Sequence, residues 1–416
     1  MIHLRQRVTP LVVLSAALSV ACSSSKSSDS ASRYLFVWAG PHGSDTSSAM
    51  SNARGVNDFL TVLDADATSP TYGKTLATQD VGTPGMMAHH MELSLPVGHP
   101  VFASDYMTGQ IFLINVDNPL APRVARRIDS VPGFRSPHSF ARLQNGNVIV
   151  AMQFGNKTIA GDPGGLVELD ATGDFIRAAS AADSAFRGAR IRPNGIELMP
   201  AIDRIVTTSM PMDDERTADV IQVWQLSGLR LLHTLAMPIP AGDTGSLLPY
   251  DARGLADGRT AMVDTYYCRL YRVSDVASDQ PHIELVHTLE HVRREGCAVA
   301  VAVGHYWVVP VAYGRAIVSL DVSNPAHPVE VSTLHTDSTF LPHWLSVDPE
   351  SDRIVVNSAD DGESRVLIAR LNRATGQLTW DDRFHDAGSS RRGVRVDGAS
   401  TRGKVMAHAA VFGPRR

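Results

Sequence analysis

Histidine begins a strand-like apolar run at four widely separated places in the chain. A small residue or a proline stands just before each place, as in Ser-Pro-His-Ser-Phe around His138. Neutral imidazoles bind copper, zinc, iron or nickel, and copper(II) stands highest in the usual affinity order. If the fold brings these places together, the sequence predicts a metal site. Its candidate ligands are His89, His90, His138, His408 and His343, and the first four are also the candidate catalytic residues.

An alternative interpretation treats each histidine as a convenient polar residue at the start of a strand, held by backbone hydrogen bonds. Recurrence at four places favours the metal site. His343 is expected to contribute least, because it precedes the bulky Trp344 and its strand could lie too far across the molecule. Each ligating ring would need a partner for its second nitrogen, and the candidates are Glu92, Asp251 or a backbone carbonyl.

The elements that must position these residues are short apolar alternations separated by Gly, Asp, Asn and Pro, without long helical periodicity. Groups of four such runs begin roughly every 50 residues, which is the length of a four-stranded propeller blade. The pattern predicts an all-β, seven-bladed β-propeller over residues 34–413. Six complete groups begin at His89, His138, Asn194, Asp251, Cys297 and His343.

The two ends of the propeller region supply the seventh blade. Residues 407–412 form an apolar run without companions, whereas runs 34–38, 58–64 and 75–81 lack an innermost strand. Pairing the N- and C-terminal strands in one blade closes the ring and removes exposed sheet edges. The innermost strands of a propeller run beside its central channel, so the histidines are expected to meet at one mouth of that channel.

The N-terminal residues have the pattern of an export signal. Residues 1–21 carry basic residues and then a short apolar run, and the site before Cys22 resembles a bacterial lipoprotein cleavage site, although Ser19 replaces the usual leucine. Cys22 would then be lipidated, residues 22–33 would form a flexible tether, and Ser23 favours an outer-membrane anchor facing the periplasm. An ordinary signal peptide is the alternative.

Other features exclude or limit several function classes. The net charge of -5 gives no reason to expect nucleic acid, and the motifs of serine hydrolases, P-loop enzymes, dinucleotide-binding enzymes and HExxH metalloproteases are missing. Cys268 and Cys297 could pair in an oxidising compartment, although the sequence leaves this open, and Cys297 is more typical of a buried structural cysteine than of a ligand. The acidic run 213–215 is typical of a solvated turn.

Several stretches, taken together, resemble the selenium-binding protein family, whose members include methanethiol oxidases. They include Phe-Leu-Thr-Val-Leu-Asp at 59–64, the His89-His90 pair, Pro137-His138, Gly-Gly-Leu-Val-Glu-Leu-Asp at 164–170, Asp-Val-Ser-Asn-Pro at 321–325 and Ala407-His408. The resemblance spans about residues 34–412 and implies a seven-bladed propeller with copper held by histidines. The family's cysteine-containing selenium segment is not found here, so selenium binding is not expected.

The expected function is that of a copper-dependent oxidoreductase. By resemblance, it would oxidise a small thiol such as methanethiol with dioxygen to formaldehyde, hydrogen sulfide and hydrogen peroxide, at His89, His90, His138 and His408. One alternative is a non-catalytic periplasmic propeller that binds a protein or envelope ligand. Another is a zinc-dependent hydrolase or lyase that uses the same histidines. The sequence leaves the physiological substrate and the oligomeric state open.

Overall fold

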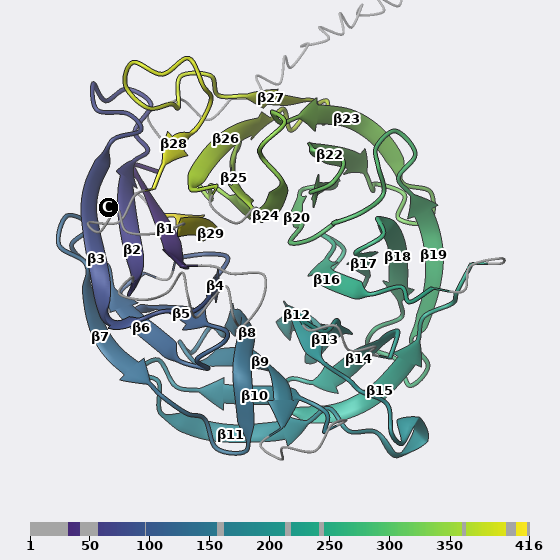
Figure 1. Ribbon diagram of the computed structural model, residues 1–416. Coiled ribbons are helices and arrows are strands. Elements are labelled where there is room, and N and C mark those ends of the chain that lie inside the picture. The colour runs from purple at the N-terminus through teal and green to yellow at the C-terminus, as the bar shows by residue number, and fades with distance from the viewer. Residues whose placement is uncertain are drawn as a thin grey trace, which may run out of the picture.

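The computed structural model describes residues 32–41, 57–95, 97–155, 162–212, 218–240, 245–359, 363–396 and 405–413. These residues form seven β-sheets arranged in a ring (Figure 1), so the prediction of an all-β, seven-bladed propeller is confirmed. The expected signal peptide, Cys22, most of the expected tether and the acidic run 213–215 lie outside the described residues. Within the described ranges, no helix has the length and apolar character needed to cross a membrane.

The blades are numbered in chain order, and each is an antiparallel sheet given from its innermost strand outward. Blade 1 contains β4 (Ala88–Met91), β5 (Val101–Asp105), β6 (Ile111–Asn115) and β7 (Arg123–Ile128). Blade 2 contains β8 (Phe134–Arg142), β9 (Val148–Gly155), β10 (Gly165–Leu169) and β11 (Phe175–Ser180). Blade 3 contains β12 (Pro193–Met199), β13 (Arg204–Ser209), β14 (Val220–Gln225) and β15 (Arg230–Ala236), with the short 3-10 helices Ser184–Phe186 and Pro200–Ile202 beside it in the chain.

The second half of the ring follows the same plan. Blade 4 contains β16 (Pro249–Gly254), β17 (Ala261–Thr265), β18 (Arg269–Ser274) and β19 (His282–Thr288). Blade 5 contains β20 (Val301–Val303), β21 (Tyr306–Val311), β22 (Ala316–Asp321) and β23 (Val329–His335). Blade 6 contains β24 (Pro342–Val347), β25 (Arg353–Ser358), β26 (Arg365–Leu371) and β27 (Leu378–Trp380), and β28 (Val394–Arg395) also pairs with β26. Blade 7 contains β29 (Val405–Phe412), β1 (Tyr34–Pro41), β2 (Asn57–Asp64) and β3 (Thr75–Pro84).

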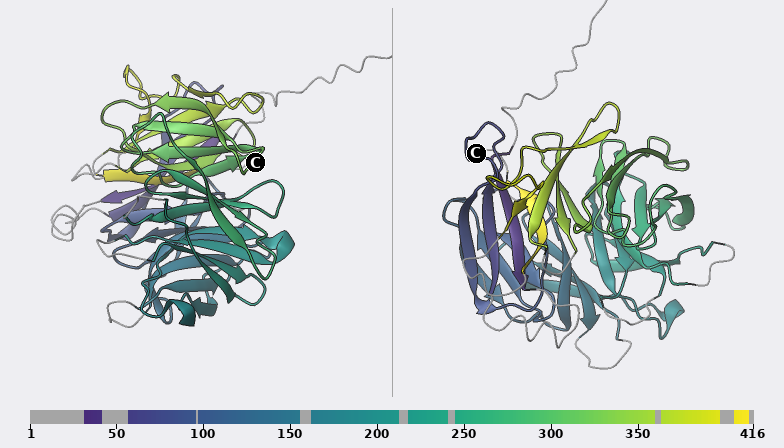
Figure 2. Two further views of the ribbon diagram at one scale, coloured as in Figure 1. Left: turned by 90° about the vertical axis from the view of Figure 1, so that its right-hand side faces the viewer. Right: turned by 45° about the horizontal axis from the view of Figure 1, so that its top comes forward.

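The burial of each strand follows its place in the ring. Inner and middle strands such as β29 and β1 are buried along almost their whole length, whereas the outermost β7 and β11 are largely exposed. Successive blades follow one another around the ring (Figure 2), so most strands are covered by a neighbouring blade on each face. Such strands need continuous apolar sequence rather than strict alternation. The core therefore consists of apolar layers between blades.

Blade 7 closes the ring in the predicted way. Leu35 pairs with Phe412 and Phe36 with Val411, so the first strand of the propeller lies beside the last. A fully buried ion pair lies next to this closure, because Arg353 contacts Asp348 at 2.7 Å and also donates to the carbonyl of Ser32. These contacts fix the beginning of the described chain against blade 6.

Blade 5 differs from the expected pattern. The group of runs that begins at Cys297 was expected to open with its innermost strand, but that strand covers only Val301–Val303. Upstream of it, Val299 forms a parallel bridge to Trp344 of blade 6, and its N–H donates to the carbonyl of His343 at 3.0 Å. Cys297 still bridges Val311 of blade 5, so residues 298–300 interrupt the inner strand and contact the next blade. Cys297 forms a disulfide with Cys268, with 5.2 Å between the two Cα atoms.

Candidate metal centre

The five candidate histidines lie together in the central channel. They come from blades 1, 2, 6 and 7 and are called the histidine cluster below. The ring centroids of His89 and His90 are 4.3 Å apart, those of His89 and His408 4.4 Å, and those of His90 and His138 4.1 Å. The ring of His343 lies 5.0 Å from that of His408. The structure therefore brings together side chains that are more than 300 residues apart in sequence.

A β-bulge lies at each of these positions. In a regular strand, neighbouring side chains point to opposite faces, so His89 and His90 could not both face one centre. A bulge breaks this alternation and redirects a side chain. The sheet registers shift between Ala88 and Met91, between Pro137 and Phe140, between Pro342 and Trp344, and at His408 opposite Trp38 and Ala39. The bulges turn the side chains toward the channel.

Three members of the cluster have the geometry of a metal site. His89, His90 and His408 are buried, and one ring nitrogen of each lies within 4.8 Å of those of the other two. Since a metal–nitrogen bond is about 2.0–2.1 Å long, ligands on opposite sides of an ion lie at most about 4.2 Å apart. A small inward movement of these rings would therefore bring the three nitrogens within bonding distance of one ion. His138 packs against His89 at 4.7 Å between centroids and stands outside this group of three.

The hydrogen bonding of His138 prepares one nitrogen for a ligand. Its Nδ1 lies 3.2 Å from the carbonyl oxygen of Asn194 and 3.0 Å from the hydroxyl of Ser139. A carbonyl only accepts, so Nδ1 carries the proton and Nε2 presents its lone pair. Nδ1 of His90 lies 3.2 Å from the same Ser139 hydroxyl, which can donate or accept, so this contact orients the ring without fixing which nitrogen carries the proton. Metal-ligating histidines normally have such a partner on their second nitrogen.

Buried nitrogens without a hydrogen-bond partner show that the cluster fits a metal ion. Among the described residues, no partner is found for either ring nitrogen of His89 or for Nε2 of His90 and of His138. Leaving a buried polar atom unsatisfied costs about 1–3 kcal/mol. A metal ion bound between these rings would satisfy several such atoms at once. This donor set, which contains only imidazoles, suits copper or zinc.

The environment keeps these imidazoles neutral, which is the form that binds metal. Burial lowers the pKa of His138 to about 3. Burial and then the neighbouring histidines hold the pKa values of His89 and His90 well below the usual range. No proton would therefore have to be displaced from a ligand nitrogen at neutral pH.

The expected partners of the ligand rings were partly wrong. Glu92 forms a buried ion pair with Arg142 at 2.7 Å, which links the end of β4 to β8, and Asp251 pairs with Arg253. Among the three expected kinds of partner, a backbone carbonyl, that of Asn194, is the one that contacts His138. Ser139 was not predicted, although its position directly after His138 could have indicated it.

His343 stands at the edge of the cluster. It is half-buried, and its Nε2 lies 3.4 Å from the hydroxyl of Tyr250. It is close to His408 despite the expectation that its blade could lie too far away, yet it is not one of the three grouped residues. The disulfide between Cys268 and Cys297 leaves no thiolate at Cys297 for the centre.

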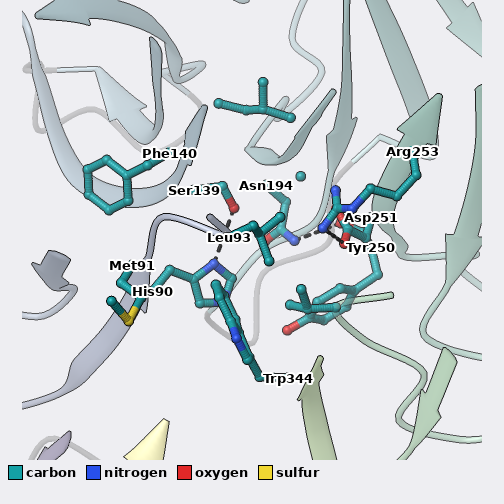
Figure 3. Close-up of a pocket in the computed structure, with 13 residues that line it drawn as sticks. His90, Met91, Leu93, Ser139, Phe140, Asn194, Tyr250, Asp251, Arg253 and Trp344 are labelled. Atoms are coloured by element: carbon teal, nitrogen blue, oxygen red, sulfur yellow. Dashed lines mark hydrogen bonds and ion pairs between the residues drawn. The ribbon is translucent and has the colours of Figure 1, made fainter. Parts of the chain in front are cut away.

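A narrow cavity adjoins the cluster (Figure 3). On one side lie His90, Ser139 and Trp344, and on the other Tyr250 and Asp251. The cavity has room for about one water molecule. In this conformation, the space beside the rings admits only very small molecules.

Comparisons with known proteins identify relatives through structure alone. No family model and no curated protein sequence matches the chain. A structure described as a hypothetical selenium-binding protein from Sulfolobus tokodaii aligns with this chain at a TM-score of 0.71 and 13% identity. The alignment covers 91% of this chain and 93% of the other. The fold, a propeller, is what this similarity shows.

Two further similar structures carry lactonase names. A putative 6-phosphogluconolactonase from Bacteroides uniformis covers 91% of this chain and 98% of its own, with a TM-score of 0.61 and 14% identity. A periplasmic gluconolactonase from Pseudomonas aeruginosa covers 90% of this chain and 98% of its own, with a TM-score of 0.61 and 12% identity. The chain thus shares its fold with propellers that carry different functional names.

Proposed function

We propose that the chain is a copper-dependent oxidoreductase of the cell envelope that oxidises a small thiol with dioxygen to an aldehyde, hydrogen sulfide and hydrogen peroxide. The observation that carries the proposal is the buried group of His89, His90 and His408 with His138 packed against it. Bound copper would supply redox chemistry between thiolate and dioxygen. The structural similarity to a protein described as selenium-binding also supports this proposal.

Each part of the site would have a distinct role. His89, His90 and His408 would hold the ion, and His138 would be the fourth ligand, held in position by Asn194 and Ser139. The small cavity would disfavour bulky thiols. A lipid anchor at Cys22 would retain the protein at the outer membrane, facing the periplasm.

A zinc-dependent hydrolase or lyase is the second candidate. Three imidazoles with one position left for water is a common arrangement of catalytic zinc. Two similar propellers carry lactonase names, which makes a lactone a reasonable probe for hydrolysis. In that case, His138 would remain outside the coordination sphere and water would take the fourth position.

The test is metal analysis followed by turnover. The mature protein is loaded with copper, its metal content is measured, and oxygen uptake with methanethiol is recorded together with peroxide. We expect one copper per chain and thiol-dependent peroxide, both lost in the His89→Ala, His138→Ala double variant. His282→Ala, on the exposed start of β19, is the matched control and should retain both.

The remaining outcomes distinguish the alternatives. Retained zinc, hydrolysis of a gluconolactone and no oxygen uptake would replace the oxidase by the hydrolase. No metal after loading with either ion, with the double variant unaltered in stability, would leave a propeller that binds a protein or envelope ligand through another surface.

A further inference from the structure

The wall of the cavity opposite the histidine cluster is polar and carries no imidazole. Asn194 begins blade 3 and Tyr250 and Asp251 begin blade 4, and Figure 3 shows them across the cavity from His90. Bulges again lie at these positions, between Pro193 and Ile196 and between Pro249 and Ala252. The central channel therefore has an imidazole side and a carboxyl side.

Two buried carboxyl groups share the carboxyl side with one cation. Asp251 pairs with Arg253, with 2.7 Å between Oδ1 and the guanidinium. Its backbone N–H donates to Oδ1 of Asp264 at 2.9 Å. Oδ2 of Asp264 is buried and, within the described residues, has no hydrogen-bond partner. Asp251 and Asp264 are called the carboxyl pair below.

Electrostatics require a proton on this pair. Arg253 can balance one negative charge. The half-buried Glu197 also lies near Arg253, and it adds a third acidic group instead of a second positive charge. A second unbalanced carboxylate in a low-dielectric interior would be strongly destabilising, so such a group binds a proton instead. Burial is the main cause that raises the pKa of Asp264 well above its usual range, and it raises that of Asp251 to about 6.

The carboxyl pair has a polar route to the histidine cluster. Asp251 lines the cavity together with His90, and the space between them has room for about one water molecule. The hydroxyl of Tyr250 lies 3.4 Å from Nε2 of His343, but among the described residues no hydrogen bond joins it to the carboxylate of Asp251. The cavity is therefore the route, and proton transfer through one water is feasible over it.

The arrangement of Asp251 and Asp264 also differs from a second metal site. Arg253 occupies the charge-balancing position beside Asp251, and the side chain of Asn194 is engaged with the carbonyl of Tyr250 at 2.8 Å. Within the described ranges, the histidines 89, 90 and 408 are the group that could hold a metal ion. A bound cation is therefore a poorer explanation for Asp264 than a bound proton.

We propose that the carboxyl pair is the proton store of the histidine centre, with Asp264 as the group that holds the proton and Asp251 as the group that faces the cavity. The role rests on the proposed function. Oxidation of methanethiol with one water to formaldehyde and hydrogen sulfide releases two electrons and two protons, and dioxygen takes up both pairs to become hydrogen peroxide. The carboxyl pair, which is protonated at rest, gives its proton when dioxygen is reduced. One of the two protons released by the next thiol oxidation refills it, and the other proton of each step is exchanged with solvent.

The first test needs no metal. Infrared spectra of the metal-free mature protein at neutral pH report protonated carboxyl groups directly. Asp264→Asn is nearly isosteric and keeps an oxygen to accept from the N–H of Asp251. It should remove one carboxylic-acid band from the spectrum. Asp58→Asn is the reference variant: Asp58 is a second buried carboxyl with a raised pKa that lies on β2 and does not line the cavity, so its replacement should remove a different acid band.

The second test separates proton storage from metal binding. Copper-loaded protein is reduced by methanethiol without oxygen and then mixed with dioxygen, and the rate of reoxidation is followed. Asp264→Asn should bind copper as the wild type does but reoxidise about a hundredfold more slowly, within the usual range for a lost proton donor. Asp58→Asn should reoxidise at the wild-type rate.

The outcomes are distinguishable. Retention of every wild-type acid band in Asp264→Asn would overturn the proton store, whatever the activity. Loss of the band with reoxidation within twofold of the wild type would overturn its role in turnover. Wild-type protein that binds copper but oxidises no thiol would reject the proposed function and proton return with it, while the infrared result still decides whether Asp264 holds a proton.

Discussion

Replacement of Ser139 by alanine tests how the ligand rings are held. Its hydroxyl lies 3.0 Å from Nδ1 of His138 and 3.2 Å from Nδ1 of His90. Ser139→Ala removes both contacts without changing a ligand. His138 keeps its contact with the carbonyl of Asn194, whereas Ser139 is the one partner that Nδ1 of His90 has among the described residues. His90 should therefore be the ring that loses its fixed orientation.

The magnitude follows from these two contacts. A hydrogen bond contributes about 0.5–1.5 kcal/mol net, so the free energy of unfolding of the metal-free protein should fall by about 1–2 kcal/mol. Loss of a partner on the second nitrogen of a ligand typically lowers metal affinity about 10–100-fold. That range corresponds to about 1.4–2.8 kcal/mol of binding free energy.

Copper affinity is measured by competition with a chelator, and stability by urea unfolding of the metal-free protein. Ser346→Ala is the matched control, because this buried hydroxyl donates to the carbonyl of Leu93 at 2.9 Å. It should lose similar stability without loss of affinity. If Ser139→Ala and Ser346→Ala bound copper equally tightly, the reasoning about ring orientation would be refuted.

Four further predictions concern stability. His89→Leu should raise the free energy of unfolding of the metal-free protein by about 1–3 kcal/mol in urea titrations while weakening copper binding, because it removes buried nitrogens without partners. The pKa of His138 is about 3 in the folded protein against an ordinary value of 6.5, so the unfolding free energy of the wild type relative to His138→Leu should be constant above pH 6.5 and fall as pH is lowered toward 3. The pKa of Asp58 is raised instead, so the unfolding free energy of the wild type relative to Asp58→Asn should fall as pH rises above 3.8, and Asp58→Asn should be more stable than the wild type at neutral pH. Cys268→Ser with Cys297→Ser should lower the free energy of unfolding by about 3–4 kcal/mol, as expected for a sequence separation of 29, and leave copper content unchanged.

Each of these predictions has a contrary outcome. His89→Leu that is less stable than the wild type would mean that packing outweighs the unsatisfied nitrogens. A difference between the wild type and His138→Leu that does not change between pH 6.5 and 3 would show that the buried ring of His138 takes up a proton as easily as the unfolded chain does. Equal stability of Asp58→Asn and wild type at neutral pH would place a compensating group beside Asp58, and copper loss in the double cysteine variant would connect the disulfide to the centre.

Local sequence was sufficient for the architecture. A repeat of four apolar runs, with unmatched runs at the two ends, predicts both the blades and the closure that pairs Leu35 with Phe412. The physical reason is that inner and middle strands are covered on both faces, so their continuous apolar runs can be recognised without knowledge of their neighbours. The short inner strand of blade 5 was missed, because Val299 pairs with Trp344 of another blade.

The sequence by itself also placed the histidines on innermost strands, which is why His89, His138 and His408 could be named as one site. His138 and His408 were expected at strand starts but lie in the middle of β8 and β29. Only the tertiary structure decided how their rings are directed and what holds them. The direction depends on bulges in the pairing with neighbouring strands, and bulges do not show in the apolar pattern of a single strand. The tertiary structure also decided that Ser139, and not Glu92, contacts the ring nitrogen of His90. This depends on distances between blades, because the Glu92 carboxylate pairs with Arg142 instead.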